Sequence, residues 1–271
     1  MSTAQLQPTR REDPRNRRAS ISVVIPAKNE ARNIAWVLER IPAFVDEIIV
    51  VDGLSTDGTL EVAKMIAPDV VVVHETQPGK GTALRAGFAA ARGDYVVMLD
   101  ADGSMDPAEI TMMTETLDQG YDFVKGSRFL AGGGSTDMTW LRGFGNARLL
   151  DLANILFRTS FSELCYGYCA FRRRALYGLE LDAVGFEIET QIVTRSIMRG
   201  LRIAEVPSNE LPRRSGESNL HAFRDGVRVL RTILRERFSA PTPTQATPRL
   251  EPIPVGELDG AEERPRSRAA L

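Results

Sequence analysis

The stretch DYVVMLDAD, residues 94–102, decides the fold expected for this chain. Five consecutive apolar residues precede two aspartates, Asp100 and Asp102. A short apolar run bounded by polar residues is typical of a buried strand. We therefore predict a strand over residues 94–100 whose carboxyl end carries carboxylates.

Strand-like and helix-like patterns alternate on both sides of this stretch. Apolar runs predict strands at 21–26, 47–53 and 70–74, and apolar residues at helical spacing predict helices at 30–40, 57–66, 80–92 and 107–118. Strands and helices that alternate at this spacing require right-handed crossovers between parallel strands. The sequence therefore predicts the α/β class, with a Rossmann-like single domain whose mainly parallel central sheet is flanked by helices.

Composition separates a folded body from the two ends of the 271-residue chain. Residues 1–19 are polar and rich in arginine, and residues 239–271 contain prolines and charges without apolar periodicity. Both compositions predict disorder, because neither segment can bury enough apolar surface. We expect a disordered arm at 1–19, the folded domain at 20–238 and a disordered tail at 239–271.

Charge and hydropathy exclude several classes of partner. The formal net charge is −2, so no nucleic-acid partner is expected. No apolar run approaches the ~20 residues that span a bilayer, and no apolar segment follows the basic N-terminus. Two cysteines, Cys165 and Cys169, suit core packing better than zinc binding, because neither histidine is close in sequence. We expect a cytoplasmic protein, with any membrane contact peripheral at the inner face.

Polar residues gather where the predicted strands end. Lys28, Asn29 and Glu30 follow the first strand, Asp52 ends the second, and Asp100, Ala101 and Asp102 end the fourth. Ligands bind at the carboxyl ends of strands in such sheets, so these residues are candidates for a binding site. Two adjacent carboxylates repel each other, and Mg²⁺ or Mn²⁺ shared with substrate phosphates relieves the repulsion. Asp100 and Asp102 are therefore candidate metal ligands, with capping of the next helix as the alternative.

Two further segments bear on the nucleotide. Asp52 is expected to accept hydrogen bonds from a base or a ribose. Residues 78–87, PGKGTALRAG, place glycines and Lys80 at the start of a helix, which suits a phosphate. The spacing is not that of a Walker A loop, and no G-x-G-x-x-G follows the first strand. A dinucleotide-dependent dehydrogenase is therefore disfavoured.

Taken together, these motifs resemble family 2 glycosyltransferases of the GT-A fold. The likeness lies in SVVIPAKNEARNI (22–34), EIIVVDGLSTDGT (47–59), GKGTALRAGFAAARGDYVVMLDADGSMDP (79–107) and KGSRF (125–129). It continues in GYCAFRRRAL (167–176), GFEIETQIVTRSIMRGLRIAEVPS (185–208) and RRSGESNL (213–220). Within the family, the chain resembles the branch of dolichyl- or polyprenyl-phosphate mannose and glucose synthases. The resemblance implies a metal-dependent, inverting hexosyltransferase that uses a UDP- or GDP-sugar.

The resemblance also implies roles for individual residues. Those expected at the nucleotide sugar are Pro26, Ala27, Asn29, Glu30, Asp52, Lys80, Asp100, Ala101, Arg128 and Ser218. Asp100 and Asp102 would form the D-x-D pair, with Asp102 the firmer metal ligand. Arg128 would face donor or acceptor phosphates, and Arg213 and Ser218 would belong to a loop that closes over the diphosphate.

The chain departs from the family pattern at two places. The usual V-D-D-G-S reads Val51-Asp52-Gly53-Leu54-Ser55, with one acid fewer. The lysine that usually ends R-x-x-G-x-S-K is Asn219, so one cation for the diphosphate is missing. Arg214 and His221 are the candidates to replace that charge.

The acceptor determines which catalytic residues are needed. A phosphate acceptor, such as a polyprenyl phosphate, is already anionic and needs no general base, whereas a hydroxyl of a soluble small molecule must lose a proton to a carboxylate. Glu187 and Glu189 are the candidate bases. They do not share a helix face, so only one is expected to reach the site, with a slight preference for Glu187.

The last helix, residues 220–238, carries an apolar stripe and a basic band side by side. Such a helix can lie on an anionic membrane or pack on the domain with a solvated face. Two other classes of function are also considered, a sugar-phosphate nucleotidyltransferase and an inactive nucleotide-sugar-binding protein. The first lacks its Gly-rich basic signature after the first strand, and the second conflicts with retention of Glu30, Asp100 and Asp102.

Overall fold

The computed structural model describes residues 17–136, 138–216, 221–239 and 250–252. The first half contains β1 (Ile21–Ala27), α1 (Ile34–Leu38), β2 (Glu47–Asp52), α2 (Thr59–Ile66), β3 (Val71–His74), α3 (Lys80–Ala90), β4 (Tyr95–Met98), the 3₁₀ turn η2 (Pro107–Glu109) and α4 (Ile110–Asp118). The second half contains β5 (Phe123–Ser127), β6 (Gly134–Ser135), α5 (Trp140–Phe157), β7 (Cys169–Arg172), α6 (Arg173–Tyr177), α7 (Ile188–Met198), β8 (Ile203–Pro207), β9 (Asn209–Glu210), α8 (Ala222–Ser239) and β10 (Leu250–Pro252).

The main sheet has the strand order β10-β8-β5-β7-β4-β1-β2-β3. Every neighbouring pair is parallel except the two that involve β7, which runs antiparallel to β4 and β5. The predicted α/β class with a mainly parallel sheet is therefore confirmed. Strands β6 and β9 form a separate two-stranded parallel sheet.

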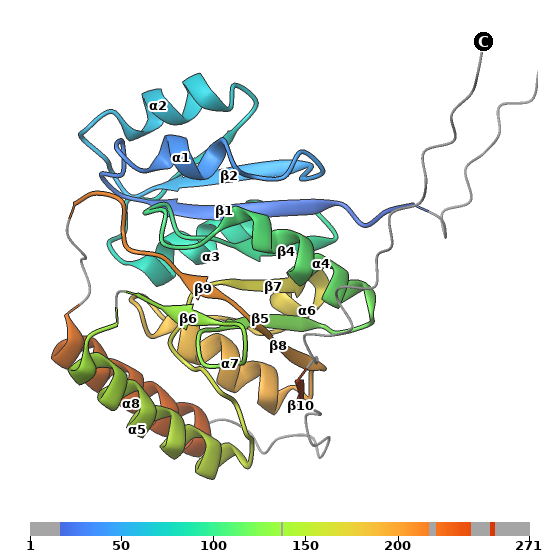
Figure 1. Cartoon of the computed structure of the whole chain (residues 1–271), viewed down its shortest axis with the longest axis vertical. Coiled ribbons are helices and arrows are strands. Elements are labelled where there is room, and N and C mark those ends of the chain that lie inside the picture. The colour runs from blue at the N-terminus through green and yellow to red at the C-terminus, as the bar shows by residue number, and fades with distance from the viewer. Residues whose placement is uncertain (1–16, 137, 217–220, 240–249, 253–271) are drawn as a thin grey trace, which may run out of the picture.

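Helices cover both faces of the main sheet, as Figure 1 shows. Alternate residues of β1 point to opposite faces, so Val23 and Ile25 pack with α1 and α4, while Val24 packs with α3. Gly87 lets α3 approach the sheet closely, because a Cβ atom there would lie 2.4 Å from Val24 and 2.7 Å from Val51. The fold is therefore a three-layer arrangement whose apolar strands are buried on both faces.

Two boundaries differ from the sequence prediction for physical reasons. The helix expected at 30–40 is regular only over Ile34–Leu38, because residues 30–33 form a turn closed by hydrogen bonds to the Glu30 carbonyl. The backbone of Leu250–Pro252, inside the expected disordered tail, pairs with β8. The other residues expected to be disordered lie outside the described part of the chain, apart from the few at 17–19 and Ser239.

Within the described ranges, no helix is both long and apolar enough to cross a membrane. Helices α5 and α8 are the longest of these, with 18 residues each. They lie together below the sheet in Figure 1.

The two thiols are expected to resist alkylation in the folded protein. Cys169 is buried in β7, and the Cys165 thiol faces Thr190 Oγ1 at 3.9 Å. Burial is the main reason that the pKa of each thiol rises to about 12. Because the thiolate is the reactive form, we expect almost no reaction with Ellman's reagent at pH 8 and full reaction of both cysteines in denaturant. Rapid labelling of the native protein would contradict this prediction.

Candidate active site

The predicted site residues lie along one edge of the sheet. Ala27 at the end of β1 is paired with Asp52 at the end of β2, and Asp52 is paired with His74 at the end of β3. Strand β4 runs parallel to β1 on its other side, so Asp100 and Asp102 follow it toward the same edge. The parallel topology thus brings together residues that are far apart in sequence.

The turn after β1 is locked onto the turn after β2. Asn29 has a positive φ of 58°, and its side-chain oxygen accepts a hydrogen bond from the Thr56 amide at 2.9 Å. The Asn29 amide donates to Ser55 Oγ at 2.9 Å, and the Ser55 amide donates to the Asp52 carboxylate at 3.2 Å. Asp52 is only 3% exposed, with His74 Nδ1 at 3.8 Å. Asn29 therefore shapes the corner at which Pro26, Ala27 and Asp52 lie.

Arg213 joins the ends of β1 and β4. Its guanidinium donates to Asp102 Oδ2 at 3.1 Å and also to the Glu30 carboxylate. Glu30 is 7% exposed and accepts a second bond, from Asn33 Nδ2, at 2.6 Å. Arg213 Nε donates to the Ser215 carbonyl at 2.8 Å. Three predicted site residues, Glu30, Asp102 and Arg213, thus form one charged cluster.

The loop of residues 211–216 lies against Asp102 and Ser104. The Leu211 amide donates to the Ser104 carbonyl at 2.8 Å, and the Arg214 amide donates to the Asp102 carbonyl at 3.3 Å. The Arg214 guanidinium stacks 4.9 Å from the centre of the Trp36 ring. The loop is thus held against the residues that follow β4. Ser218 and Asn219 lie outside the described residues.

Lys80 forms the second charged cluster. Its Nζ lies 2.8 Å from Asp100 and 2.9 Å from Glu189. Burial alone would lower the pKa of Lys80, but the two carboxylates raise it above its usual value. Burial, together with the charges of Asp102 and Glu189, raises the pKa of Asp100 to about 6, although Lys80 opposes this. The cluster has more carboxylates than cations.

The glycine loop before α3 is not the phosphate cradle that the sequence suggested. The Gly81 and Thr82 amides both donate to the Val184 carbonyl, at 2.8 and 3.2 Å. A Cβ atom at Gly79 would lie 2.2 Å from that oxygen, and one at Gly81 would lie 2.4 Å from the Ala183 oxygen. The glycines are needed because another loop passes close by, and only Lys80 points toward the aspartates.

Glu187 and Glu189 have different surroundings, as the sequence predicted. Glu187 accepts hydrogen bonds from the Val184 and Gly185 amides at 3.2 and 2.9 Å, at the entrance to α7. Glu189, on the first turn of α7, reaches Lys80. The residue beside Asp100 is therefore Glu189, whereas the slight preference had been for Glu187, and the identity of a base stays a prediction.

Arg128 pairs with carboxylates inside the protein. It is 6% exposed, and its guanidinium pairs with Glu163 at 2.8 Å and Glu210 at 2.9 Å. Its ring partner is Tyr166, at 4.7 Å. Burial would lower the pKa of Arg128, but the two carboxylates raise it. Two carboxylates thus hold Arg128 in place, while its second terminal nitrogen, Nη2, has no hydrogen-bond partner among the described residues, and its contact with phosphates stays a prediction.

Sequence reasoning missed the residue opposite Lys80. A Cβ atom at Gly167 would lie 2.9 Å from Glu189 Oε1 and 3.0 Å from Lys80 Nζ. Only glycine leaves room for this ion pair. The signal was the central glycine of Cys165-Tyr166-Gly167-Tyr168-Cys169, a glycine that the family resemblance included without assigning it a role.

The aspartate pair fits a divalent cation that is shared with a ligand. Among the described residues, no group of three or more His, Cys, Asp or Glu side chains is placed to hold an ion by itself. Asp100 and Asp102 offer oxygen ligands, and their side chains are about one-fifth exposed. Mg²⁺ and Mn²⁺ are commonly held by one or two carboxylates together with substrate phosphates. The donor set therefore suits such an ion when a diphosphate completes it.

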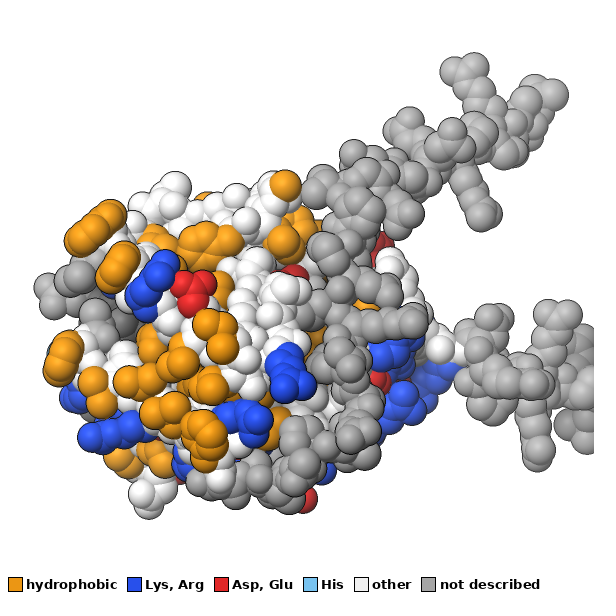
Figure 2. All heavy atoms as spheres, turned by 90° about the horizontal axis from the view of Figure 1, so that it is seen from below, with side chains coloured by type: hydrophobic (Ala, Val, Ile, Leu, Met, Phe, Trp, Pro, Cys, Tyr) orange, Lys and Arg blue, Asp and Glu red, His pale blue; other side chains and the backbone are white. Residues whose placement is uncertain are grey.

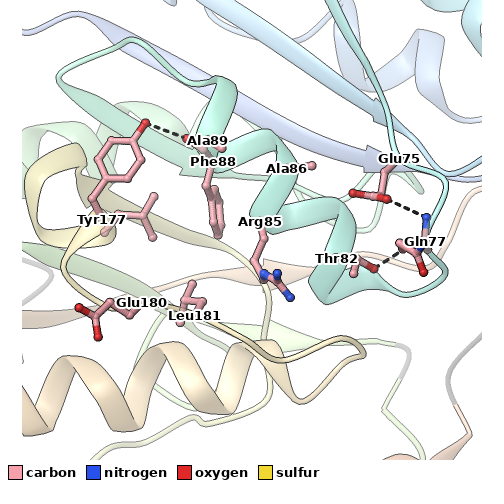
Figure 3. Close-up of a pocket in the computed structure, with 11 residues that line it drawn as sticks. Glu75, Gln77, Thr82, Arg85, Ala86, Phe88, Ala89, Tyr177, Glu180 and Leu181 are labelled. Atoms are coloured by element: carbon pink, nitrogen blue, oxygen red, sulfur yellow. Dashed lines mark hydrogen bonds between the residues drawn. The ribbon is translucent and has the colours of Figure 1, made fainter.

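A groove elsewhere on the molecule contains none of these residues. It has a volume of about 460 Å³ and lies between α3 and the segment that follows α6. Figure 3 shows Glu75, Arg85, Tyr177 and Glu180 around it, with Phe88 and Leu181 also lining it. Its charges are of both signs and form no cluster. The sheet edge is therefore the better candidate for chemistry.

Comparison with known proteins matches the same part of the chain. The family model "Glycosyl transferase family 2" matches residues 22–179. Glycosyltransferase AglJ of Haloferax volcanii is 35% identical over 211 residues, which cover 76% of this chain and 68% of that protein. Polyprenol monophosphomannose synthase of Mycolicibacterium smegmatis is 33% identical over 211 residues, covering 73% of this chain and 80% of that one.

A solved structure agrees with this result. Glucosyl-3-phosphoglycerate synthase of Mycobacterium tuberculosis superimposes with a TM-score of 0.64 and 27% identity, covering 82% of this chain and 81% of that one. That structure contains Mn²⁺, uridine diphosphate and glucosyl-3-phosphoglycerate.

Proposed function

This chain belongs to glycosyl transferase family 2 and is a glycosyltransferase, and from that premise we propose that it transfers a hexose from a UDP- or GDP-sugar to a polyprenyl phosphate. The observation that carries the proposal is the cluster of Glu30, Asp102 and Arg213 at the ends of β1 and β4. It combines a carboxylate for a metal with a cation for a diphosphate beside the corner formed by Asn29 and Asp52. The similarity to polyprenol monophosphomannose synthase supports the acceptor.

In this proposal the donor lies across the sheet edge. The nucleoside occupies the corner at Pro26, Ala27 and Asp52, where the Asp52 carboxylate accepts hydrogen bonds. The diphosphate then lies toward Asp102. Mg²⁺ or Mn²⁺ bound by Asp100 and Asp102 would supply positive charge to the diphosphate oxygens.

Arg213 then acts on the leaving group. Transfer breaks the bond between sugar C1 and the diphosphate oxygen, whose electron pair leaves with the diphosphate. The acceptor oxygen forms the new bond to C1 from the opposite face, which inverts the configuration. Arg213 exchanges its contacts with Glu30 and Asp102 for the diphosphate, and stabilises the negative charge that develops there.

The surroundings of Glu189 favour a phosphate acceptor. A phosphate oxygen is already ionised and needs no base, whereas a hydroxyl must give up a proton. Lys80 already donates to Glu189 Oε1 at 2.9 Å, so this oxygen is engaged in an ion pair inside the protein. Lys80 and Glu189 thus position Asp100, and no base is needed for the transfer.

A soluble acceptor with a hydroxyl is the second candidate. The similarity to glucosyl-3-phosphoglycerate synthase, solved with a soluble phosphorylated product, supports it. In that case Glu189, and not Glu187, is the residue beside Asp100 that could take the proton.

We expect a sugar-linked polyprenyl phosphate when the protein is incubated with Mn²⁺, a short-chain polyprenyl phosphate and the correct nucleotide sugar. UDP-glucose and GDP-mannose are the first donors to test, with the product identified by mass spectrometry and its anomeric configuration by NMR. The reaction should stop with EDTA and recover when Mn²⁺ or Mg²⁺ is restored. Transfer only to 3-phosphoglycerate would select the soluble acceptor, and no turnover of any nucleotide sugar would contradict the proposal.

A further inference from the structure

The outer faces of α5 and α8 expose large apolar side chains. Eleven large apolar residues are exposed in the described part of the chain, and six of them lie on these two helices. They are Trp140, Phe144 and Ile155 on α5, and Phe223, Leu234 and Phe238 on α8. Trp140 and Phe223 are 80% and 87% exposed. We refer to the surface formed by these six residues and the arginines around them as the α5/α8 face.

The two helices form one continuous surface. Arg237 Nε near the end of α8 donates to the Leu156 carbonyl near the end of α5 at 3.0 Å, so their carboxyl ends lie together. On the inner side, Val229 and Ile233 of α8 are buried in the core that also contains Ile192 of α7. The inner side therefore accounts for the packing of α8, and the exposed aromatic residues are not needed for it.

The charge on α8 is also one-sided. Five exposed arginines lie along the helix: Arg224, Arg228, Arg231, Arg235 and Arg237. Its two carboxylates, Asp225 and Glu236, are only 3% and 4% exposed. Asp225 accepts from the His221 amide at 2.7 Å and also lies 3.5 Å from Arg228. Glu236 accepts from Gln191 and Arg195 on α7, and from Arg235 at 2.9 Å. In a chain with a net charge of −2, the exposed side of α8 is a local basic surface, and the exposed acid Asp151 on α5 is paired with Arg148 at 3.1 Å.

Figure 2 shows this side of the molecule. Apolar side chains gather at its centre, with lysine and arginine side chains among and around them and few acidic ones in view. This pattern suits an anionic membrane surface. Aromatic residues can enter the headgroup region of a bilayer, and arginines can pair with lipid phosphates.

We propose that the α5/α8 face binds an anionic lipid bilayer surface. A second copy of the chain fits less well, because a two-fold contact would bring the arginines of one copy against those of the other. A lipid surface supplies both an apolar phase for Phe223 and Trp140 and phosphate groups for the arginines. The long arginine side chains can extend to the headgroups while their aliphatic parts lie on apolar surface.

The position of α8 in the chain relates this face to the active site. Only residues 217–220 separate His221 from the loop of residues 211–216 that covers Asp102. In Figure 1, α8 begins on the side of the molecule toward which β1 runs. This proposal rests on the proposed function, because binding to a bilayer would bring the active site to an acceptor that is carried by a lipid.

We expect the purified protein to sediment with vesicles of phosphatidylcholine mixed with phosphatidylglycerol, and not with vesicles of phosphatidylcholine alone. Phe223→Ser and Arg231→Glu should each weaken this binding by about tenfold, because they remove an apolar anchor and reverse a charge at the surface. The matched controls are Met65→Ser on α2 and Arg174→Glu on α6, whose side chains are 77% and 80% exposed on other elements. The controls should bind as the unchanged protein does.

Equal weakening by the variants and their controls, or equal binding to neutral and anionic vesicles, would overturn the proposal. A stable dimer in analytical ultracentrifugation that Phe223→Ser dissociates would overturn it in favour of a second copy. Because sedimentation needs no catalysis, a protein that binds vesicles but transfers no sugar would refute only the proposed function. Variants that lose vesicle binding should keep full turnover of a detergent-dispersed acceptor.

Discussion

Replacing Asp102 by asparagine is expected to lower kcat/KM by about a thousandfold. The Asp102 carboxylate meets Arg213 at 3.1 Å and accepts from the Ser104 amide at 2.9 Å. Asparagine keeps the size of the side chain but removes the charge that holds both the metal and the cationic loop. Loss of charge stabilisation at the leaving group lowers the rate by factors of about 10² to 10³, and a weakened metal site adds to this. Initial rates measured over a range of donor concentrations, at one ordinary Mn²⁺ concentration, provide kcat/KM.

The matched control for this variant lies on the same loop. Asp106 is also an aspartate near β4, but its carboxylate caps η2 by accepting from the Ala108 amide at 3.0 Å. Asparagine caps well too, so Asp106→Asn should retain nearly full activity and stability. If Asp102→Asn retained activity at ordinary Mn²⁺ concentrations, or if both variants lost it equally, the role of Asp102 would have to be abandoned.

Much of the fold could be predicted because its signal is local. Strands β1 to β4 are short, mainly apolar runs, and each is followed by a helix before the next strand, so their parallel order follows from the rules for such crossovers. The antiparallel strand β7 was not predicted. Its residues, Cys169–Arg172, lie between β4 and β5, and no local feature of the sequence specifies that pairing.

The candidate site could be located but not assembled from the sequence. Strand ends identified Glu30, Asp52, Asp100 and Asp102, since a parallel sheet brings its carboxyl ends to one edge. The partners of these acids come from distant segments: Glu189 is 109 residues from Lys80, and Glu30 is 183 residues from Arg213. Side-chain pairs at such separations leave no periodic signal in the sequence.

The same limit applies to Arg128, whose two carboxylate partners were not predicted. Arg128 follows β5, where a family resemblance suggested phosphates, but its partners Glu163 and Glu210 lie 35 and 82 residues further along the chain. Whether an arginine faces a ligand or a buried carboxylate depends on those partners. The sequence around Arg128 does not contain them.

Arg128→Met is expected to destabilise the protein by about 3 to 5 kcal/mol, with a fall in Tm of about 10 °C. The substitution leaves the Glu163 carboxylate, 1% exposed, without its cation, and a buried unpaired charge is costly. Glu163 also accepts from the Leu164 and Cys165 amides at 3.0 and 3.1 Å, so the change should loosen the segment that leads to Gly167. Thermal and urea unfolding, followed by circular dichroism, measure the effect.

The double variant Arg128→Met with Glu163→Gln separates the buried-ion-pair role of Arg128 from a phosphate-binding role. Glutamine removes the unpaired charge yet keeps an oxygen that accepts the two amides, so the double variant should recover part of the lost stability. If Arg128 served only to bind a phosphate, we would expect the reverse pattern. Arg128→Met would then keep near-normal stability but lose activity, and adding Glu163→Gln would not restore that activity.

Glu210 lies 2.9 Å from the same guanidinium and is 14% exposed at its side chain, so water can solvate it when the arginine is gone. Replacing Glu163 should therefore restore far more of the lost stability than replacing Glu210, because the more deeply buried carboxylate is the one that requires a counter-charge.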